Sequence, residues 1–312
     1  MVVNRTSQPS DNSQPADGKP RRLGNLRCIV GESLIWSPRD GKLFFTDLVG
    51  KSFHSYDPAT RVFESWDAPE FATSIGIRRD GGFVVGLEQR ICLWEPGGDF
   101  ATLAIPEPDR PGNRLNEGVV GPDGAFWVGT MATNLHSDGT PKEQDGPLGA
   151  YYRVRPDGRV ERLTPNEYGI TNTMAWSADG KFLTADTVAN TIHSFRVGDD
   201  GQIGNQTIFE QGFPRGLPDG SCMDAEGFLW NCRVAGGSCV SRFAPDGRLD
   251  RMVELPCAWP TSCAFGGPGL DTLYVTSATF TMSEAHLAAN PHEGGLYAVD
   301  AGVKGIASYQ FG

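Results

Sequence analysis

The sequence repeats one short pattern six times: a turn, usually Asp-Gly, followed by a few β-forming residues. The turns lie roughly 40 to 56 positions apart, at Asp40, Asp80, Asp123, Asp179, Glu226 and, in a degenerate form, Pro268. Asp-Gly between two apolar runs is typical of a β-hairpin, because glycine adopts a positive φ without steric cost. The segments after the turns are rich in Phe, Val, Trp, Leu and Thr, which favour strands. This repeat excludes folds in which helices alternate with strands.

Secondary turns between the main ones, such as RPDGRV and APDGRLD, indicate a second hairpin in each repeat. Two hairpins make a four-stranded antiparallel blade, so the sequence predicts an all-β, six-bladed β-propeller. We expect one domain over residues 23–312, preceded by a disordered polar tail at residues 1–22. A strand near Arg27–Val30 is expected to pair with the carboxyl-terminal GGLYAVD segment and close the ring.

The composition excludes several classes of function. The net charge of −11 disfavours binding to nucleic acid or to an anionic membrane surface. No apolar run approaches the roughly 18 residues of a transmembrane helix, and the amino terminus lacks the apolar core of a signal peptide. The seven cysteines are an odd number without a Cys-x-x-Cys pair, which indicates reduced thiols. We therefore expect a cytoplasmic protein.

Oxygen-bearing side chains recur where the innermost strand of each blade should begin. Counting back from each turn, with the first blade aligned on its tryptophan, gives six equivalent positions: Glu32, Thr73, Asn116, Asn172, Asp219 and Thr261. Strand starts favour several of these residue types for local turn chemistry alone. All six equivalent positions at this level of the channel nevertheless carry a side-chain oxygen. This indicates a site for a hard cation, since carboxylate and amide oxygens are its preferred ligands. The histidines occupy none of these positions, and no Gly-x-Ser-x-Gly motif is present.

Several sequence blocks resemble one known family. GESLIWSPRDGKLFFTD, NRLNEGVVGPDGAFWVGTM, ITNTMAWSADGKFLTADT, LPDGSCMDAEGFLW and PTSCAFGGPGLDTLYVTS occur in this order. They are similar to the SMP-30/gluconolactonase/regucalcin family from about Gly31 to the carboxyl terminus. The resemblance implies a six-bladed propeller that binds one divalent metal in its channel, and many family members hydrolyse sugar lactones.

The same resemblance implies the metal ligands: Glu32, Asn172 and Asp219. The cation is expected to be Ca, Mg, Mn, Zn or Fe(II). It would act as a Lewis acid on the lactone carbonyl, and Asp219 would be the catalytic residue, as the general base or as the anchor of the attacking water.

Substrate contacts are also implied by the resemblance. Arg114 stands where the family has an arginine that holds sugar hydroxyls, and Asn116 where it has a substrate-contacting or water-linked asparagine. Glu117 replaces an aspartate that commonly follows this asparagine, and Asn134 replaces an acidic substrate contact of some members. The polar stretch at residues 133–147 lengthens the third blade and is expected to be either a lid over the channel mouth or a tolerated surface insertion.

These observations predict a metal-dependent hydrolase that opens a small-molecule sugar lactone to the aldonic acid. A phosphotriesterase-like or broad lactonase is an alternative, which a larger apolar pocket would favour. A non-catalytic calcium-binding scaffold is a second alternative, which a metal fully enclosed by protein ligands would favour. Fold analogy alone does not decide among them.

Overall fold

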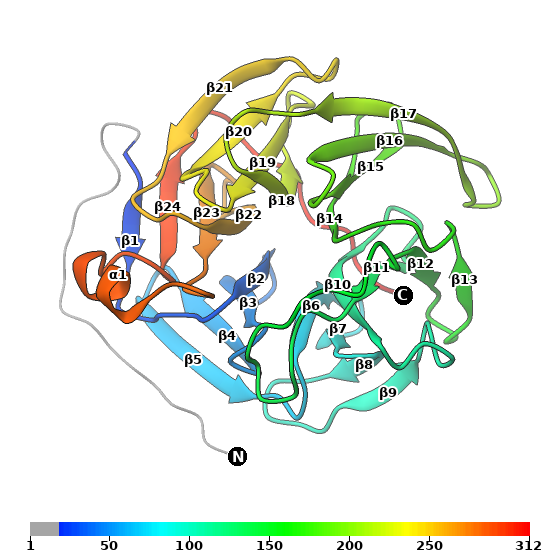
Figure 1. The fold of residues 1–312 in the computed structure, drawn as a ribbon. Helices are drawn as coiled ribbons and strands as arrows, with labels where there is room; N and C mark the ends of the chain where they lie inside the picture. Colours follow the sequence, from blue (N-terminus) through cyan, green and yellow to red (C-terminus); the bar gives the residue numbers. More distant parts are fainter. Residues whose placement is uncertain (1–18) are drawn as a thin grey trace.

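A computed structural model describes residues 19–312, in which six four-stranded sheets surround a central channel (Figure 1). Blade one contains β2 (Gly31–Ser37), β3 (Lys42–Asp47), β4 (Ser52–Asp57) and β5 (Val62–Asp67). Blade two contains β6 (Ala72–Ile77), β7 (Phe83–Leu87), β8 (Arg90–Trp94) and β9 (Ala101–Ala104). Blade three contains β10 (Asn113–Val120), β11 (Phe126–Ala132), β12 (Tyr151–Val154) and β13 (Val160–Arg162).

The other half of the ring repeats this order. Blade four contains β14 (Thr171–Trp176), β15 (Lys181–Asp186), β16 (Thr191–Val197) and β17 (Ile203–Gln211). Blade five contains β18 (Leu217–Met223), β19 (Leu229–Val234), β20 (Cys239–Phe243) and β21 (Leu249–Glu254). Blade six contains β22 (Pro260–Gly266), β23 (Thr272–Ser277), β24 (Leu296–Asp300) and, from the start of the chain, β1 (Arg21–Leu23). The predicted six-bladed β-propeller is confirmed.

The ring closes through β1, which pairs antiparallel with β24 and places Leu23 opposite Leu296. The expectation that Arg27–Val30 forms this strand is wrong. Those residues lead inward to β2. Separate backbone contacts, but no strand, join them to blade six, among them an isolated bridge between Val30 and Ala278, and the Cys28 amide donating to the Gly294 carbonyl at 2.8 Å. Two residues of the predicted tail, Arg21 and Arg22, belong to β1. Residues 1–18 of the predicted tail lie outside the described part of the chain.

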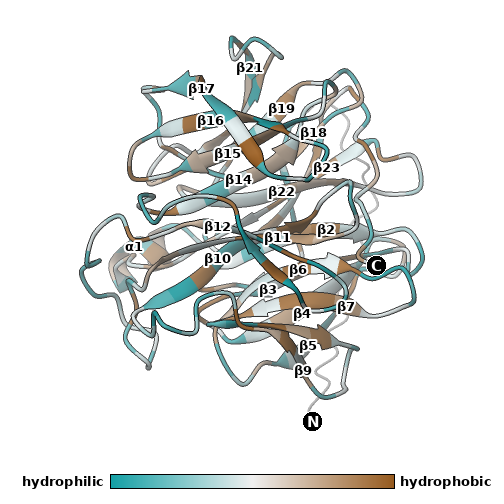
Figure 2. Ribbon diagram, turned by 90° about the vertical axis from the view of Figure 1, so that its right-hand side faces the viewer, coloured by the Kyte–Doolittle hydropathy of each residue, from teal (hydrophilic) through white to brown (hydrophobic). Residues whose placement is uncertain are grey.

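In blades three and five, a turn aspartate holds the tryptophan of the following strand. Asp123 accepts a hydrogen bond from the Trp127 indole N–H at 3.0 Å, and Asp224 accepts one from Trp230 at 2.8 Å. Trp127 is fully buried and lies edge-on to Trp176, with ring centroids 5.4 Å apart. Apolar residues accordingly concentrate in the strands, while many connecting turns are hydrophilic (Figure 2). Packing between blades therefore follows from the repeated pattern.

The last residues cross one end of the channel (Figure 1). Gly305 forms a bridge with Asp224 of blade five, Phe311 pairs with Arg78 in the β6–β7 turn of blade two, and the Gly312 amide donates to the Gly124 carbonyl of blade three. The short helix α1 (Glu284–Ala289) follows β23 and buries none of its residues. Among the described residues, no helix has the length and apolar character needed to cross a membrane.

Candidate metal centre and binding pocket

A β-bulge interrupts each innermost strand at the level of the six predicted oxygen-bearing residues. The pairing of β2 with β3 shifts after Glu32, and that of β14 with β15 shifts after Asn172. Equivalent shifts occur in β6, β10, β18 and β22. The residues that follow these two, Ser33 and Thr173, adopt positive φ values of 51° and 50°. Because a bulge redirects side chains, this repeated irregularity turns polar groups toward the channel.

The bulges surround a cavity of about 240 Å³ at one end of the channel, which we call the entrance pocket. It brings together six of the seven residues predicted for the site: Glu32, Arg114, Asn116, Asn134, Asn172 and Asp219. Thr261 lines the same pocket. Thr73, at the equivalent position in blade two, is buried and does not line it.

A chain of hydrogen bonds fixes the polar wall of this pocket. Arg114 donates to the Asn116 Oδ1 at 2.8 Å, and the Asn116 amide donates to the Asn172 Oδ1 at 2.9 Å. Asn172 in turn donates to the Thr187 hydroxyl at 2.9 Å. Arg114 also donates to the Asn134 Oδ1 at 3.1 Å. These bonds orient both asparagines, so that Asn172 presents its amide oxygen on the side of Asn116.

The pocket buries more negative than positive charge. Burial raises the pKa of Glu32 well above its usual range, and repulsion from Asp219 and Glu117 raises it further. Burial, with repulsion from Glu117, raises the pKa of Asp219 in the same way. Arg114 is the nearby cation, and burial lowers its pKa to about 10. Two carboxylates in one dry pocket are therefore stabilised as anions only by additional positive charge.

A divalent cation fits this arrangement. The Asp219 Oδ1 is buried and has no hydrogen-bond partner in the protein. An unpartnered buried carboxylate oxygen is costly unless a cation or another donor satisfies it. Two carboxylates and an amide oxygen form a donor set for hard cations such as Ca²⁺, Mg²⁺ or Mn²⁺. Glu32, Asn172 and Asp219 are therefore the residues able to hold a metal here.

Glu117 does not line the entrance pocket, contrary to the position expected for it. Like Asn116, it lies inside the bulge of β10, but it faces a second cavity of about 120 Å³ further along the channel. Burial raises its pKa to about 7, and its Oε2 has no hydrogen-bond partner. Cys222 and Cys263 line the same cavity, and their sulfurs are 3.6 Å apart. Glu117 therefore acts on the entrance pocket through its charge.

Two supporting residues have no signal in the sequence. Thr187 accepts from Asn172 and donates to the Pro218 carbonyl at 2.7 Å, thereby joining blades four and five. Asn231, on β19, donates to the Asp219 carbonyl at 3.0 Å. Both contacts depend on how neighbouring strands meet. A count along the chain therefore does not identify these residues.

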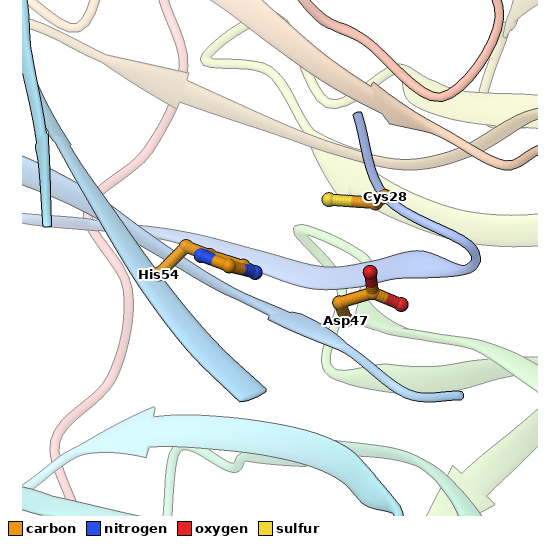
Figure 3. Close-up of side chains that lie close together, drawn as sticks. All are labelled: Cys28, Asp47 and His54. Carbon is orange, nitrogen blue, oxygen red and sulfur yellow. The ribbon is translucent and has the colours of Figure 1, made fainter. Parts of the chain in front are cut away.

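A second group of metal-binding residue types lies in blade one, where Cys28, Asp47 and His54 converge (Figure 3). Hydrogen bonds within the protein already account for two of them. Asp47 accepts from the backbone amides of Ile29, Val30 and Gly50, and His54 bonds to the hydroxyls of Ser52 and Ser65.

Blade four repeats the arrangement without the cysteine. Asp186 accepts from the amides of Gly169 and Val188, His193 occupies the position of His54, and Tyr168 replaces Cys28. The Asp-His pair is thus part of the blade framework. The entrance pocket, with its unpartnered carboxylate oxygen, is the better candidate for the metal.

The insertion at residues 133–147 extends from blade three toward blade one and contributes to the pocket. Asn134 and Leu135 line the pocket. A tight turn follows, in which the His136 amide donates to the Thr140 carbonyl at 2.8 Å. Lys51, in the turn between β3 and β4, donates to the Ser137 carbonyl at 3.2 Å. The insertion is therefore part of the pocket wall rather than a loop remote from the site.

The fold and the channel site define a propeller with a candidate cation centre, and comparison with known proteins identifies its family. Residues 30–279 match the family model described as "SMP-30/Gluconolactonase/LRE-like region". The chain belongs to this family. It is 32% identical to regucalcin of Oryctolagus cuniculus, over 91% of this chain and 95% of the relative.

Two further similarities come from bacteria. The chain is 31% identical to a 6-deoxy-6-sulfogluconolactonase of Pseudomonas putida, over 92% of this chain and 98% of the relative. It also resembles the crystal structure of a calcium-binding protein, regucalcin, from Agrobacterium tumefaciens. That similarity has a TM-score of 0.85 and 27% identity, and it covers 94% of this chain and 97% of the other.

Proposed function

We propose that this protein is a metal-dependent lactonase whose cation is held by Glu32, Asn172 and Asp219. The observation that carries the proposal is the pair of buried carboxylates at one end of the channel, one with an unpartnered oxygen. A polar wall of Arg114, Asn116 and Asn134 lies beside them. The related sulfogluconolactonase and the calcium-binding regucalcin structure support this proposal.

Hydrolysis adds water across the ring ester. The water oxygen attacks the carbonyl carbon, the ring C–O bond breaks, and the products are a carboxylate, a hydroxyl group and one released proton. A divalent cation held by Glu32, Asn172 and Asp219 would supply Lewis-acid polarisation of the carbonyl and would lower the pKa of water. Asp219 holds the attacking water or accepts its proton. Arg114 and Asn134 orient the lactone, and Asn116 holds the Arg114 side chain in position.

Sugar lactones are the first substrates to test, as expected from the sequence. Protein stripped of metal would be assayed for acid release from aldonolactones with a pH indicator, before and after addition of Ca, Mg, Mn, Zn or Fe(II). We expect acid release that depends on added metal, and we expect Asp219→Ala to abolish it. The exposed turn residue Asp246 supplies a matched control, because Asp246→Ala removes a carboxylate outside the pocket.

An Asp219→Ala protein with full turnover would contradict the assignment. If metal binds but no lactone is opened, the calcium-binding scaffold becomes the better interpretation. A broad lactonase is a second candidate, favoured by the apolar residues of the pocket wall. We place the reaction in the cytoplasm, and the seven free thiols of the structure support a reducing compartment.

A further inference from the structure

Most of the entrance pocket wall is apolar. The polar residues gather around the candidate cation centre, whereas the remaining wall contains Leu48, Val49, Leu135, Ile170, Trp259 and Phe280. These side chains come from blades one, three, four and six. A ligand bound at the carboxylates would therefore extend along a surface that offers no hydrogen bonds from side chains other than the Trp259 indole.

Hydrogen bonds within the protein already occupy much of the polar wall. Arg114 donates to the Leu115 carbonyl at 2.9 Å as well as to Asn116 and Asn134. The Asn116 amide donates to both the Thr171 carbonyl and Asn172. The Thr261 hydroxyl donates to the Gly31 carbonyl. Among the buried side-chain atoms of this wall, the Arg114 Nε and the Asp219 Oδ1 remain without a partner. These free groups are fewer than the several hydroxyls of an aldonolactone, and a buried hydroxyl without a partner weakens binding.

The insertion builds part of this apolar wall. Leu135 is buried against Leu48 and Phe71, and Val49 and Phe280 pack on the same cluster. The insertion is anchored at both sides of Leu135, since Asn134 accepts from Arg114 and Ser137 accepts from Lys51. A wall fixed in this way selects by shape and hydrophobicity, because its side chains are already ordered before the ligand binds.

We propose that the entrance pocket selects lactones whose ring has an apolar alkyl or aryl substituent over fully hydroxylated aldonolactones. This inference rests on the proposed lactonase function and names its substrate class. The ester group lies at the carboxylates and Arg114, and the substituent packs against Leu135 and Phe280. Transfer of this substituent from water to the wall supplies the selectivity.

The test compares three lactones at one saturating metal concentration: D-glucono-1,5-lactone, δ-valerolactone and δ-nonalactone, which has a butyl substituent. We expect kcat/KM for δ-nonalactone to exceed that of each of the other two at least tenfold. Leu135→Asn and the less buried Phe280→Ser should each lower kcat/KM for δ-nonalactone at least fivefold and leave δ-valerolactone within twofold. Ile208→Asn, on the exposed outer strand β17, is the matched control and should change neither.

A binding measurement separates this inference from the proposed function. The δ-lactams piperidin-2-one and 6-butylpiperidin-2-one resemble the lactones and resist hydrolysis, so calorimetry reports binding without turnover. We expect at least tenfold tighter binding of the butyl compound and loss of this difference in Phe280→Ser. Selective lactam binding without hydrolysis of any lactone would retain the inference and overturn the lactonase proposal. Equal lactam affinities, or a preference for gluconolactone, would overturn the inference.

Discussion

Single residues at this site depend on one another through a continuous chain of contacts. Arg114, Asn116, Asn172 and Thr187 form successive hydrogen bonds around the channel. The neighbouring residues fix which way the side-chain amides of Asn116 and Asn172 point. Replacement of one member of the chain therefore changes the orientation of the next. Asp219 lies outside this chain of side-chain hydrogen bonds, and its Oδ1 has no partner in the protein.

Replacement of Asp219 by Asn removes one of two buried carboxylates and one of the three proposed cation ligands. We therefore expect the metal-free protein to become more stable, because repulsion between Asp219 and Glu32 is lost. We also expect cation affinity to fall by roughly 100-fold or more, since the changed residue is one of the three proposed ligands. Thermal unfolding with and without Ca²⁺ or Mn²⁺ measures both effects. An unchanged metal-induced shift in Tm would contradict the assigned ligand.

His54 makes stability depend on pH. Burial lowers its pKa to about 4, and Asp47 opposes this only in part. The folded protein keeps His54 neutral down to about this pH, whereas the unfolded chain binds a proton below about pH 6.5. His54 therefore does not lower the free energy of unfolding above pH 6.5. As the pH falls from 6.5 toward 4, proton binding by the unfolded chain lowers the free energy of unfolding by roughly 3 kcal/mol in total.

Urea unfolding at pH 5 and pH 7 measures this contribution. In the His54→Gln variant, the free energy of unfolding should differ less between pH 5 and pH 7 than it does in the wild type. A variant of the exposed His292 serves as the control and should retain the full difference. Equal pH dependence in wild type and His54→Gln would show that other groups cause it.

The strands and their bulges explain how far the sequence predicts the structure. The Asp-Gly turns predict the hairpins because glycine has a positive φ there, as at Gly124 and Gly180 with φ values of 72° and 78°. The repeat then places Glu32 and Asn172 at one level of the channel. The bulge is not visible in the repeat, and it explains why Asn116 and Glu117, adjacent in sequence, face different cavities.

The sequence pattern does not reveal β1, the strand that closes the ring, and the reason is physical. β1 has only three residues, two of them arginines, so it shows no alternation of apolar and polar residues. Its pairing depends on the edge that β24 presents, which no local pattern reports. The more apolar CIV segment at residues 28–30 gives a stronger local strand signal but leads into β2.

The apolar anchor of β1 is Leu23, which packs in the cluster that joins blades six and one. We expect Leu23→Ala to reduce the free energy of unfolding by roughly 2 to 5 kcal/mol, since it leaves a cavity at the ring closure. Ile29→Ala is the matched control, because Ile29 is 40% exposed, and it should change stability by about 0.5 kcal/mol or less. Urea denaturation of both variants tests this; equal effects would argue against a special role for β1.

At the scale of the whole molecule, the two ends of the channel differ. The entrance pocket opens among the loops that include the insertion, whereas residues 306–309 of the carboxyl-terminal segment line the second cavity at the other end. Phe311 anchors this segment between blades two and three. The segment thus limits access to Glu117 and Cys222 from that side.

A chain that ends at Lys304 should expose the second cavity. We expect the Cys222 thiol to react with a water-soluble disulfide reagent roughly tenfold faster than in the full-length protein. The reaction is measured under solution conditions in which circular dichroism shows that the truncated protein is folded. The truncated chain with Cys222→Ser is the control that assigns the fast phase, and equal rates in long and short chains would contradict the role of the segment.

The pairing of β1 with β24 also has a consequence for synthesis on the ribosome. β1 ends at Leu23, and its partner β24, the last of the described strands, begins at Leu296, so β1 is translated long before the strand with which it pairs. At about 5 to 20 residues per second, this interval lasts on the order of 10 to 60 seconds. During that time the nascent chain has exposed strand edges, and Arg21 and Arg22 discourage premature pairing of β1 with a wrong edge. Ring closure therefore waits until β24 has left the ribosome, and ribosome-bound chains truncated before β24 should remain open arcs.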